Sequence, residues 1–355
     1  MRRYSAQKSK KKNKVIGRNI KKTITRVLLI PILFLVSLGF FGVYFTLKYV
    51  NKSFAMASFS QGEVPYDIKG DTFPTLLYVV VEDIDKEPIN IKTIKFIVFD
   101  RINDNISTYI IPAEIKYDIA GRYGEEELSK TIALGGMNSD DYLNDGIKVL
   151  KNTTFKIFGF NTDKFLVVSE EQKNIFDEML SNGTFLDIVK IKDIIEVSGE
   201  FKTDMTFSEF YNLFSYIKPL PNERLNKEVL NEERLLNPGS IDQDFSDYAL
   251  ESPISQENKS ISILNGSNYP GVATLVSRLV KNNGGRVVAI GNSDQPYSNS
   301  IIIAENTDSL TCRYLSKALG IPNIVDKNGT NLGEHEIDRS DIVVILGFDT
   351  SEQLY

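Results

Sequence analysis

The sequence predicts an α/β protein in which one transmembrane helix precedes two exported domains. Three observations predict this fold class. An uncharged apolar run covers residues 27–47, strand-like and helix-like patterns alternate over 70–218, and a shorter alternation of the same kind covers 260–349. The chain of 355 residues is long enough for two ordinary domains. These bounds leave residues 1–26 as a basic cytoplasmic tail and 219–259 as a linker.

The tail and the apolar run together predict a membrane anchor. Residues 1–26 contain eleven Lys or Arg side chains and no Asp or Glu. The 21 uncharged residues at 27–47 would form a helix about 31 Å long, which matches the hydrocarbon core of a bilayer. The positive charge places the amino terminus in the cytoplasm and both domains on the outer side of the cell membrane. A cleaved signal peptide is the alternative, but its apolar region would be shorter, roughly 7–15 residues.

The composition excludes several kinds of chemistry. The chain has one cysteine, Cys312, and one histidine, His335, so we expect no disulfide, no metal site and no Ser-His or Cys-His catalysis. We interpret Cys312 as a small packed or surface side chain on a helix and His335 as an exposed loop residue. Residues 51–355 hold 29 basic and 47 acidic side chains, and this net charge of −18 is unfavourable for nucleic-acid binding. Catalysis would therefore depend on carboxylates, Arg, Lys or backbone amides.

Alternating elements predict a layered α/β domain over residues 70–218. Runs of β-branched and aromatic residues predict strands, and helical spacing with capping residues predicts helices. Thr206 followed by Glu209, for example, is typical of a helix amino terminus. The predicted strands are 75–81, 91–99, 106–112 and 164–168, and the predicted helices are 125–134, 140–150, 169–180 and 206–217.

Residues 219–259 break this pattern, because they are charged and polar with prolines at both ends. We interpret them as a linker able to wrap the first domain, with docking segments at 235–236 and 245–250. Residues 260–349 then predict a small βαββαβ domain. Its helices begin near Pro270 and at Thr307 and end before Gly284 and Gly320, and its predicted strands are 260–264, 286–290, 300–304 and 342–346.

The turn after the first strand of the small domain carries the candidate ligand-binding residues. The segment LNGSNYPGVA, residues 264–273, has the pattern of a strand end, a tight turn and a helix start. Such a junction can hold an anion with backbone N–H groups and the helix dipole, which makes Asn265, Gly266 and Gly271 candidates. The alternative is structural. Both glycines would then serve only the turn and close packing, because no Lys follows as in a P-loop.

Three segments of the small domain resemble the C-terminal accessory domain of LytR-type cell-envelope proteins: LNGSNYPGVA at 264–273, VVAIGN at 287–292 and VVILG at 343–347. In that family the domain follows a membrane anchor and a LytR-CpsA-Psr catalytic domain, and this chain has the same predicted order. Residues 75–185 resemble a diverged LytR-CpsA-Psr domain. The segments that carry this second resemblance are TLLYVVVED, IIPAEIKYDIAGRYG at 110–124, LSKTIALGG at 128–136 and TDKFLVVSEEQKNIFDEM.

The resemblance implies an enzyme that transfers glycopolymer from a polyprenyl-pyrophosphate carrier to peptidoglycan. Arginines would hold the pyrophosphate, acidic residues Mg²⁺, and an apolar pocket the lipid. This chain departs from that pattern, because Ala113 stands at the position of a family Arg and Glu114 at that of its Asp. Residues 123–223 contain no Arg, so Arg101 and Arg122 are the only arginines of the presumed catalytic domain. Lys lacks the planar fork that grips phosphate oxygens in pairs.

We therefore expect a cell-envelope protein that has lost catalysis and binds wall glycopolymer, carrier lipid or a protein partner. The alternative is an active Mg²⁺-dependent phosphotransferase that uses Glu114 and Arg122. A third hypothesis is a regulator or scaffold whose basic tail contacts cytoplasmic partners. The expected partners are the lipid bilayer, peptidoglycan, wall glycopolymer or a polyprenyl-linked carrier, without nucleic acid. We expect no cofactor, with Mg²⁺ only if the transferase site is active.

Overall fold

The computed structural model describes residues 37–39, 41–42, 44, 74–182, 201–217, 220–330 and 332–355. The strands and helices named below all lie in one compact unit, Phe54–Tyr355. Within it, we call the described residues 74–257 the first domain and residues 258–355 the C-terminal domain. No helix of the described residues is long and apolar enough to cross a membrane. Most of the predicted anchor at 27–47 lies outside the described residues, so the anchor stays a prediction.

The first domain is built on a six-stranded mixed sheet. Its strands are β1 (Thr75–Val81), β2 (Ile91–Asp100), β3 (Asn105–Pro112), β6 (Lys164–Ser169), β7 (Phe201–Thr203) and β8 (Leu225–Val229). They lie in the order β7-β6-β1-β2-β3-β8. β1 is parallel to β6 and antiparallel to β2, and β3 is parallel to β8. Every residue of β1 is buried, as expected of a central strand covered on both faces.

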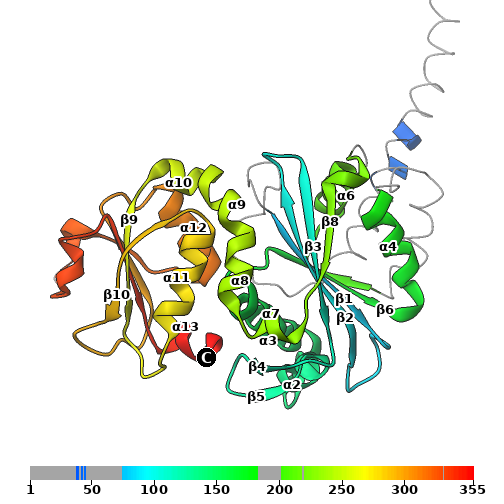
Figure 1. The fold of residues 1–355 in the computed structure, drawn as a ribbon, viewed down its shortest axis with the longest axis horizontal. Helices are drawn as coiled ribbons and strands as arrows, with labels where there is room; N and C mark the ends of the chain where they lie inside the picture. The colour runs from blue at the N-terminus through cyan, green and yellow to red at the C-terminus, as the bar shows by residue number, and fades with distance from the viewer. Residues whose placement is uncertain are drawn as a thin grey trace, which may run out of the picture. The chain divides into compact units, whose positions relative to one another are not determined.

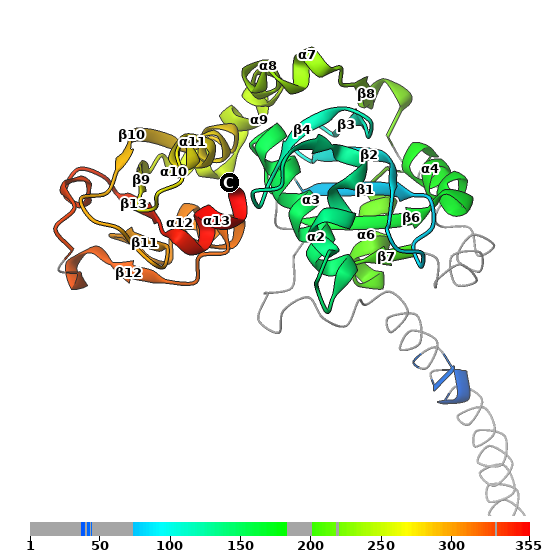
Figure 2. The same ribbon diagram turned by 90° about the horizontal axis from the view of Figure 1, so that it is seen from below.

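Helices cover both faces of this sheet, which gives an α-β-α arrangement (Figures 1 and 2). One face is covered by α2 (Thr131–Gly136), α3 (Tyr142–Phe158), α7 (Glu232–Leu235), α8 (Pro238–Asp242) and α9 (Ser246–Glu251). In the core on that face, the rings of Phe96 and Phe158 stack with centroids 4.2 Å apart. The other face is covered by α4 (Lys173–Asn182) and α6 (Phe207–Ile217), where Phe176 packs edge-on against Phe201 and Phe210.

The four strands predicted for this domain are confirmed to within one residue at each end. The helix predicted over 125–134 is wrong in its first half. Residues 124–127 form β5 (Gly124–Glu127), which pairs antiparallel with β4 (Lys116–Ile119), and the α-helix begins only at Thr131. Cross-strand pairing favours the strand over the predicted helix here, because Lys116 lies opposite Glu127 and opposite charges stabilise such pairs.

The segment predicted as a linker carries regular structure of its own. β8 extends the large sheet beside β3, and α7–α9 pack over the core, followed by α10 (Pro253–Glu257). Both predicted docking segments contribute a fully buried side chain, Leu235 and Phe245, while Leu236 and Leu250 stay exposed. The segment is therefore an integral part of the first domain's core.

The C-terminal domain contains a five-stranded sheet with α11 and α12 on one face and irregular segments on the other (Figure 1). The strand order is β10-β9-β13-β11-β12, and β10, β9 and β13 are mutually parallel. The structure contains all elements of the predicted βαββαβ order and, in addition, β12 and α13, which were not predicted. The elements are β9 (Ser260–Asn265), α11 (Val272–Asn282), β10 (Arg286–Asn292), β11 (Ile301–Ala304), α12 (Leu310–Leu319), β12 (Ile324–Asp326), β13 (Ile342–Leu346) and α13 (Phe348–Leu354).

The C-terminal domain caps a helix of the first domain. Arg278 on α11 donates hydrogen bonds to the carbonyl oxygens of Lys156 and Ile157, at 2.7 and 3.0 Å. These groups lie in the last turn of α3, where carbonyls have no partner within the helix. The carboxylate of Asp242 on α8 accepts hydrogen bonds of 2.8 Å from both Arg278 and Asn282. One charged network thus joins α3, α8 and α11.

Candidate functional site

The two catalytic candidates lie in the turns on either side of β4. Glu114 follows β3 and is exposed, and its carboxylate forms no ion pair with another described residue. Ala113, at the position where the resemblance implies an Arg, is only 3% exposed and packs in the core of the first domain. Its buried methyl group offers no charge to a phosphate.

Arg122 is held by the C-terminal domain. Its guanidinium forms an ion pair with Glu352, donates a hydrogen bond to the Tyr269 hydroxyl, and lies 5.0 Å from the centroid of the Tyr269 ring. Its backbone φ of +65° is uncommon outside glycine and sets the direction of the side chain. About half of the Arg122 side chain remains exposed, so the ion pair itself adds at most about 1 kcal/mol.

The ligand-binding candidates form an internally bonded turn. The Asn265 side-chain amide donates to the carbonyl of Tyr269 at 2.8 Å, and its oxygen accepts from the backbone N–H and hydroxyl of Ser267 at 3.0 and 2.7 Å. A β-carbon on Gly266 would lie 2.9 Å from the ring of Tyr297. Gly271 has a φ of +80° where α11 begins. These contacts give all three residues a structural role, and ligand binding by them stays a prediction.

Tyr269 brings the two predicted sites together. It lies in the turn that Asn265 organises, and it is the residue that contacts Arg122, 147 positions earlier. Its ring also packs on Tyr355 and Phe348, with centroids 5.0 and 6.3 Å away. Sequence reasoning missed Tyr269, although it stands inside the LNGSNYPGVA segment, and it missed Glu352, which no local pattern marks.

A polar groove of about 440 Å³ opens beside this turn. It lies at the carboxyl ends of the parallel strands β9 and β10, where α/β sheets commonly bind ligands. Amides and hydroxyls dominate its lining, one carboxylate is present, and none of the described lining residues is Lys or Arg. Such a groove suits a ligand rich in hydroxyl groups better than an anion. The lining residues are Asn265, Gly266, Ser267, Asn268, Pro270, Asn292, Ser293, Asp294, Gln295 and Pro296.

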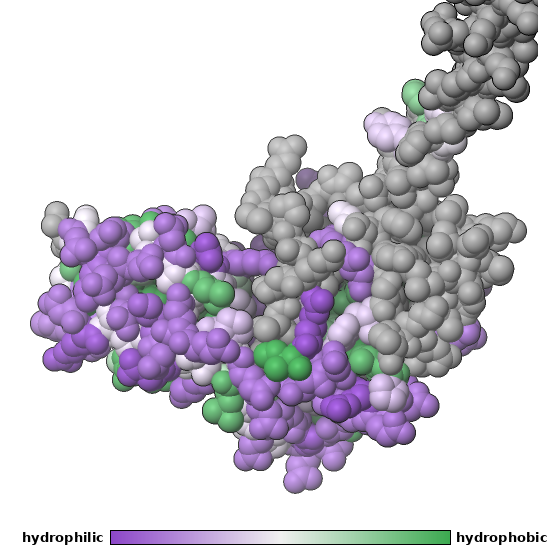
Figure 3. Space-filling model, turned by 90° about the horizontal axis from the view of Figure 1, so that it is seen from above, coloured by the Kyte–Doolittle hydropathy of each residue, from purple (hydrophilic) through white to green (hydrophobic). Residues whose placement is uncertain are grey.

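One face of the C-terminal domain is mostly hydrophilic. In Figure 3 the C-terminal domain, at the left, is mostly purple with scattered apolar residues. Of the two alternatives for Cys312, packed or surface, the structure shows the packed one, and His335 is exposed as predicted. Cys312 is fully buried in the core under α12, where burial raises its pKa to about 11. Among the described residues, no group of three or more His, Cys, Asp or Glu side chains could hold a metal ion.

A second hollow, of about 420 Å³, lies on the α4 face of the large sheet. Lys95 and Asp177 pair across it at 2.5 Å. Tyr78 is buried beside them, and burial, reinforced by the Asp177 charge, raises its pKa. Lys227 and Glu178 also line the hollow. The described lining therefore carries two Lys and two carboxylates, unlike the wholly apolar pocket that a lipid tail needs.

Comparison with protein families decides the nature of the C-terminal domain. Residues 258–349 match the LytR_C family, described as LytR cell envelope-related transcriptional attenuator. The C-terminal domain is of the LytR C-terminal type. The resemblance expected from its three sequence segments is thus confirmed for about a quarter of the chain. The chain matches none of the curated proteins with which it was compared.

Solved structures with partial similarity cover about half of the chain. Bacillus subtilis TagV is 11% identical with a TM-score of 0.37, over 49% of this chain and 97% of TagV. TagT bound to LI-WTA is 11% identical with a TM-score of 0.35, over 54% and 96%. The LytR-CPS2A-psr family protein YwtF (TagT) with bound octaprenyl pyrophosphate lipid is 9% identical with a TM-score of 0.35, over 54% and 96%. TM-scores below 0.5 assign no ligand or activity to this chain.

Proposed function

We propose that this chain is a membrane-anchored, extracytoplasmic cell-envelope protein of LytR-CpsA-Psr type that binds wall glycopolymer without transferring it. The LytR-type C-terminal domain supports the envelope role. The basic tail and the uncharged run at 27–47 support the anchor and its orientation. The domain boundaries that we propose are 1–26 for the tail, 27–47 for the anchor, 70–218 for the LytR-CpsA-Psr-like domain and 260–349 for the C-terminal domain. The segment between the two domains, predicted as a linker, belongs with the first of them, because its β8 and α7–α9 complete that domain's sheet and core.

One observation carries the loss of catalysis. Arg122, the arginine available in the presumed catalytic loop, is engaged by Glu352 and Tyr269 of the C-terminal domain. Phosphoryl transfer depends on preorganised positive charge around the transferred group. A guanidinium that is already neutralised by a carboxylate and stacked on a ring supplies little of that charge. The buried Ala113 supplies none.

The polar groove beside Asn265 is the proposed binding surface. Side-chain amides offer paired donors and acceptors that match neighbouring sugar hydroxyls. Asn268 and Asn292 line the groove, and both are exposed. Because neither side chain has a hydrogen bond among the described residues, both can be changed without disturbing the turn.

The catalytic part of the proposal is tested with the full-length chain in detergent, incubated with a polyprenyl pyrophosphate with and without Mg²⁺. We expect no Mg²⁺-dependent phosphate release above a protein-free blank, and the same result for Glu114→Ala and Arg122→Ala. Metal-dependent release that disappears in Glu114→Ala would instead establish the active phosphotransferase.

The binding part is tested by measuring retention of the full-length chain on purified cell-wall glycopolymer. Asn268→Ala and Asn292→Ala should each weaken binding about fivefold, the effect of one lost hydrogen bond. Asn328→Ala is the matched control, since Asn328 is an exposed amide outside the groove and should bind as the wild type does. Equal binding by all variants would exclude the groove as the binding surface.

A further inference from the structure

Hydrogen-bond donors are scarce in the polar groove beside Asn265. Two of its lining residues, Pro270 and Pro296, have no backbone N–H. The N–H groups of four others donate to acceptors inside the protein, at distances between 2.8 and 3.2 Å. These four residues are Gly266, Ser267, Ser293 and Asp294. An anion binds to free N–H groups or to a cation, so the groove offers it little beyond side-chain amides.

The amino-terminal end of α11 does not relieve this shortage. Val272 and Ala273, the first two residues of the helix, are buried at 3% and 5% exposure, and neither lines the groove. The positive end of a helix dipole acts on an anion mainly through the N–H groups of the first turn. A ligand in the groove has no direct access to these two N–H groups.

Negative charge, in contrast, is present in the groove and directly behind it. Asp294 is exposed, and its carboxylate has no hydrogen bond or ion pair with another described residue. Glu334 is only 5% exposed, and its carboxylate accepts the Asp294 backbone N–H at 3.0 Å and the Tyr297 hydroxyl at 2.9 Å. The two acidic side chains therefore act together on a ligand, and no described lining residue is a Lys or Arg that would neutralise them.

The rest of the groove suits hydroxyl groups. The exposed amides of Asn268 and Asn292 can each donate and accept a hydrogen bond, as a sugar hydroxyl also can. The volume of about 440 Å³ lies within the range of about 300–1,000 Å³ that is typical of small-molecule sites. One site thus combines an unpaired carboxylate with two amides that are free to bind hydroxyls.

We propose that the groove recognises an amino sugar whose amine is free and protonated. The ammonium group donates to Asp294, and the charge of Glu334 adds to the attraction. Hydroxyls of the same ring or of the next one pair with Asn268 and Asn292. An N-acetylated sugar lacks the charge, and a unit with a phosphate or a carboxylate is repelled. The inference rests on the proposed function for the polymer that carries this sugar, and it names the part of that polymer which is bound.

The test uses the full-length chain in detergent and three soluble hexamers with the same β-1,4-linked backbone, built from glucosamine, N-acetylglucosamine or glucose. Calorimetric titration at about pH 6 keeps the amine protonated. We expect the glucosamine hexamer to bind about fivefold more tightly than either uncharged hexamer, which is the upper effect of one exposed ion pair. Equal binding of all three hexamers, or no binding of the glucosamine hexamer, would overturn the proposal.

Variants separate recognition in the groove from a general attraction of amines to an acidic chain. Asp294→Asn removes the charge and keeps the shape of the side chain, so it should bind the three hexamers equally. Asp294→Lys should bind the glucosamine hexamer more weakly than the glucose hexamer. The matched control is Asp308→Asn, because Asp308 is an exposed carboxylate of the C-terminal domain outside the groove, and it should keep the fivefold preference. A preference that survives in Asp294→Asn, or an equal loss in the control, would contradict the assignment.

A further probe shows whether the sugar itself is needed. Nα-acetyl-lysine amide carries an ammonium group without neighbouring hydroxyls, so it should bind at least tenfold more weakly than the glucosamine hexamer. Binding of equal strength would point to an amine on a peptide and would overturn the assignment to a sugar.

The outcomes also distinguish this inference from the proposed function. Retention on wall glycopolymer that is lost in Asn268→Ala, without any preference for the glucosamine hexamer, would support the groove as the binding surface and reject the amino sugar. Binding of the glucosamine hexamer that is lost in Asp294→Asn, without retention on the polymer, would support the amino sugar and reject wall glycopolymer as its source.

Discussion

Two glycines that follow helices show how closely the domains approach each other. Gly159 after α3 and Gly320 after α12 have nearly the same left-handed backbone, with φ of +59° and +63°. A β-carbon on Gly159 would lie 2.7 Å from the side-chain nitrogen of Asn282 and 3.1 Å from Arg278. Nothing lies within 4 Å of one on Gly320. The first position therefore needs glycine for its backbone and for the domain contact, and the second only for its backbone.

This difference predicts two unequal losses of stability. Gly320→Ala should lower the free energy of unfolding by about 1 kcal/mol through backbone strain. Gly159→Ala should lower it by about 2–3 kcal/mol, because the methyl group also displaces Asn282. Urea denaturation of both variants measures the two values. Equal losses would mean that Asn282 can move away from the added methyl group without lowering the free energy of unfolding further.

Asp341 predicts an acid-dependent part of the stability. Hydrogen bonds from the hydroxyl and then the backbone N–H of Ser260 lower its pKa from the ordinary value of 3.8. A carboxyl group whose pKa is lower in the folded chain stabilises the fold above its unfolded pKa, and this contribution is lost as pH falls through the folded pKa. Asp341→Asn should therefore be less stable than the wild type at neutral pH. The difference should shrink below about pH 4, as measured by thermal melting.

At the scale of the element, the end of α3 is completed by α11. Arg278 contacts two terminal carbonyls of α3 and the carboxylate of Asp242, and its side chain is mostly buried. Removing one member of such a network leaves the others without partners in a region that water reaches poorly. The network accordingly contributes more than a surface ion pair does.

We predict that Arg278→Ala lowers the free energy of unfolding by about 2–4 kcal/mol. Arg339→Ala, at a position where the side chain is 72% exposed and pairs with Glu336, should lower it by less than about 0.5 kcal/mol. Chemical denaturation compares them. In the Arg278 variant, amide hydrogen exchange in the last turn of α3 should also accelerate, and an unchanged exchange rate there would contradict the capping role.

The elements differ in how well the sequence predicts them. β1, β6 and β13 have runs of apolar β-branched residues, and such runs predict buried strands wherever they lie. β5 is GEEE and β8 is LNKEV, so their strand conformation depends on pairing with β4 and β3 and not on local preference. Short helices such as α7–α10 are too brief to show a helical period.

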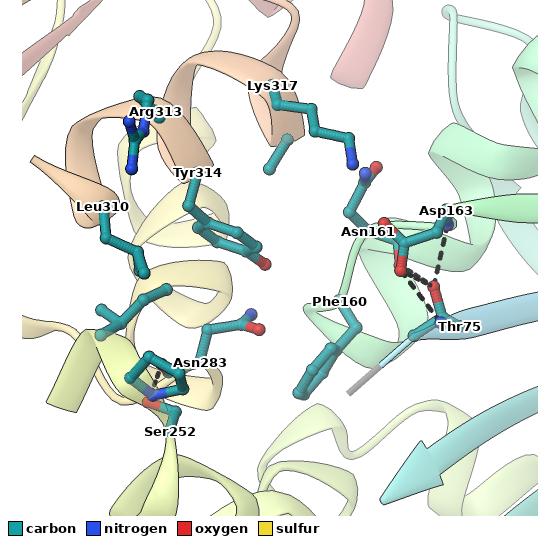
Figure 4. Close-up of a pocket in the computed structure, with 13 residues that line it drawn as sticks. Thr75, Phe160, Asn161, Asp163, Ser252, Asn283, Leu310, Arg313, Tyr314 and Lys317 are labelled. Atoms are coloured by element: carbon teal, nitrogen blue, oxygen red, sulfur yellow. Dashed lines mark hydrogen bonds between the residues drawn. The ribbon is translucent and has the colours of Figure 1, made fainter. Parts of the chain in front are cut away.

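At the scale of the whole molecule, contacts between residues far apart in the sequence are the reason why only part of the candidate site could be predicted. The turn at 264–273 is local, so its strand end, tight turn and helix start are visible in the sequence. The ion pair of Arg122 with Glu352 spans 230 positions and depends on how the two domains dock. A cavity of about 270 Å³ between the domains (Figure 4) has the same origin, because its aromatic residues, Phe160 and Tyr314, come from different domains and form no motif.

Anchoring is the prediction that concerns the whole chain. The full-length protein should remain with membranes after carbonate extraction, and deletion of residues 27–47 should release it into the soluble fraction. Deletion of residues 2–22 should leave it in the membrane fraction, since the apolar run is intact. Release of the full-length chain by carbonate, or its recovery at a shortened size, would favour the cleaved signal peptide.

The capping of α3 by Arg278 has a consequence for biosynthesis. Translation proceeds from the amino terminus, and Lys156 precedes Arg278 by 122 positions. Until residue 278 has also emerged, the carbonyl oxygens of Lys156 and Ile157 at the end of α3 can therefore accept hydrogen bonds only from water. The fold of the first domain is finished by a later segment, so a nascent chain released early should be an easy substrate for envelope proteases. The C-terminal domain would thereby act as a checkpoint for complete synthesis.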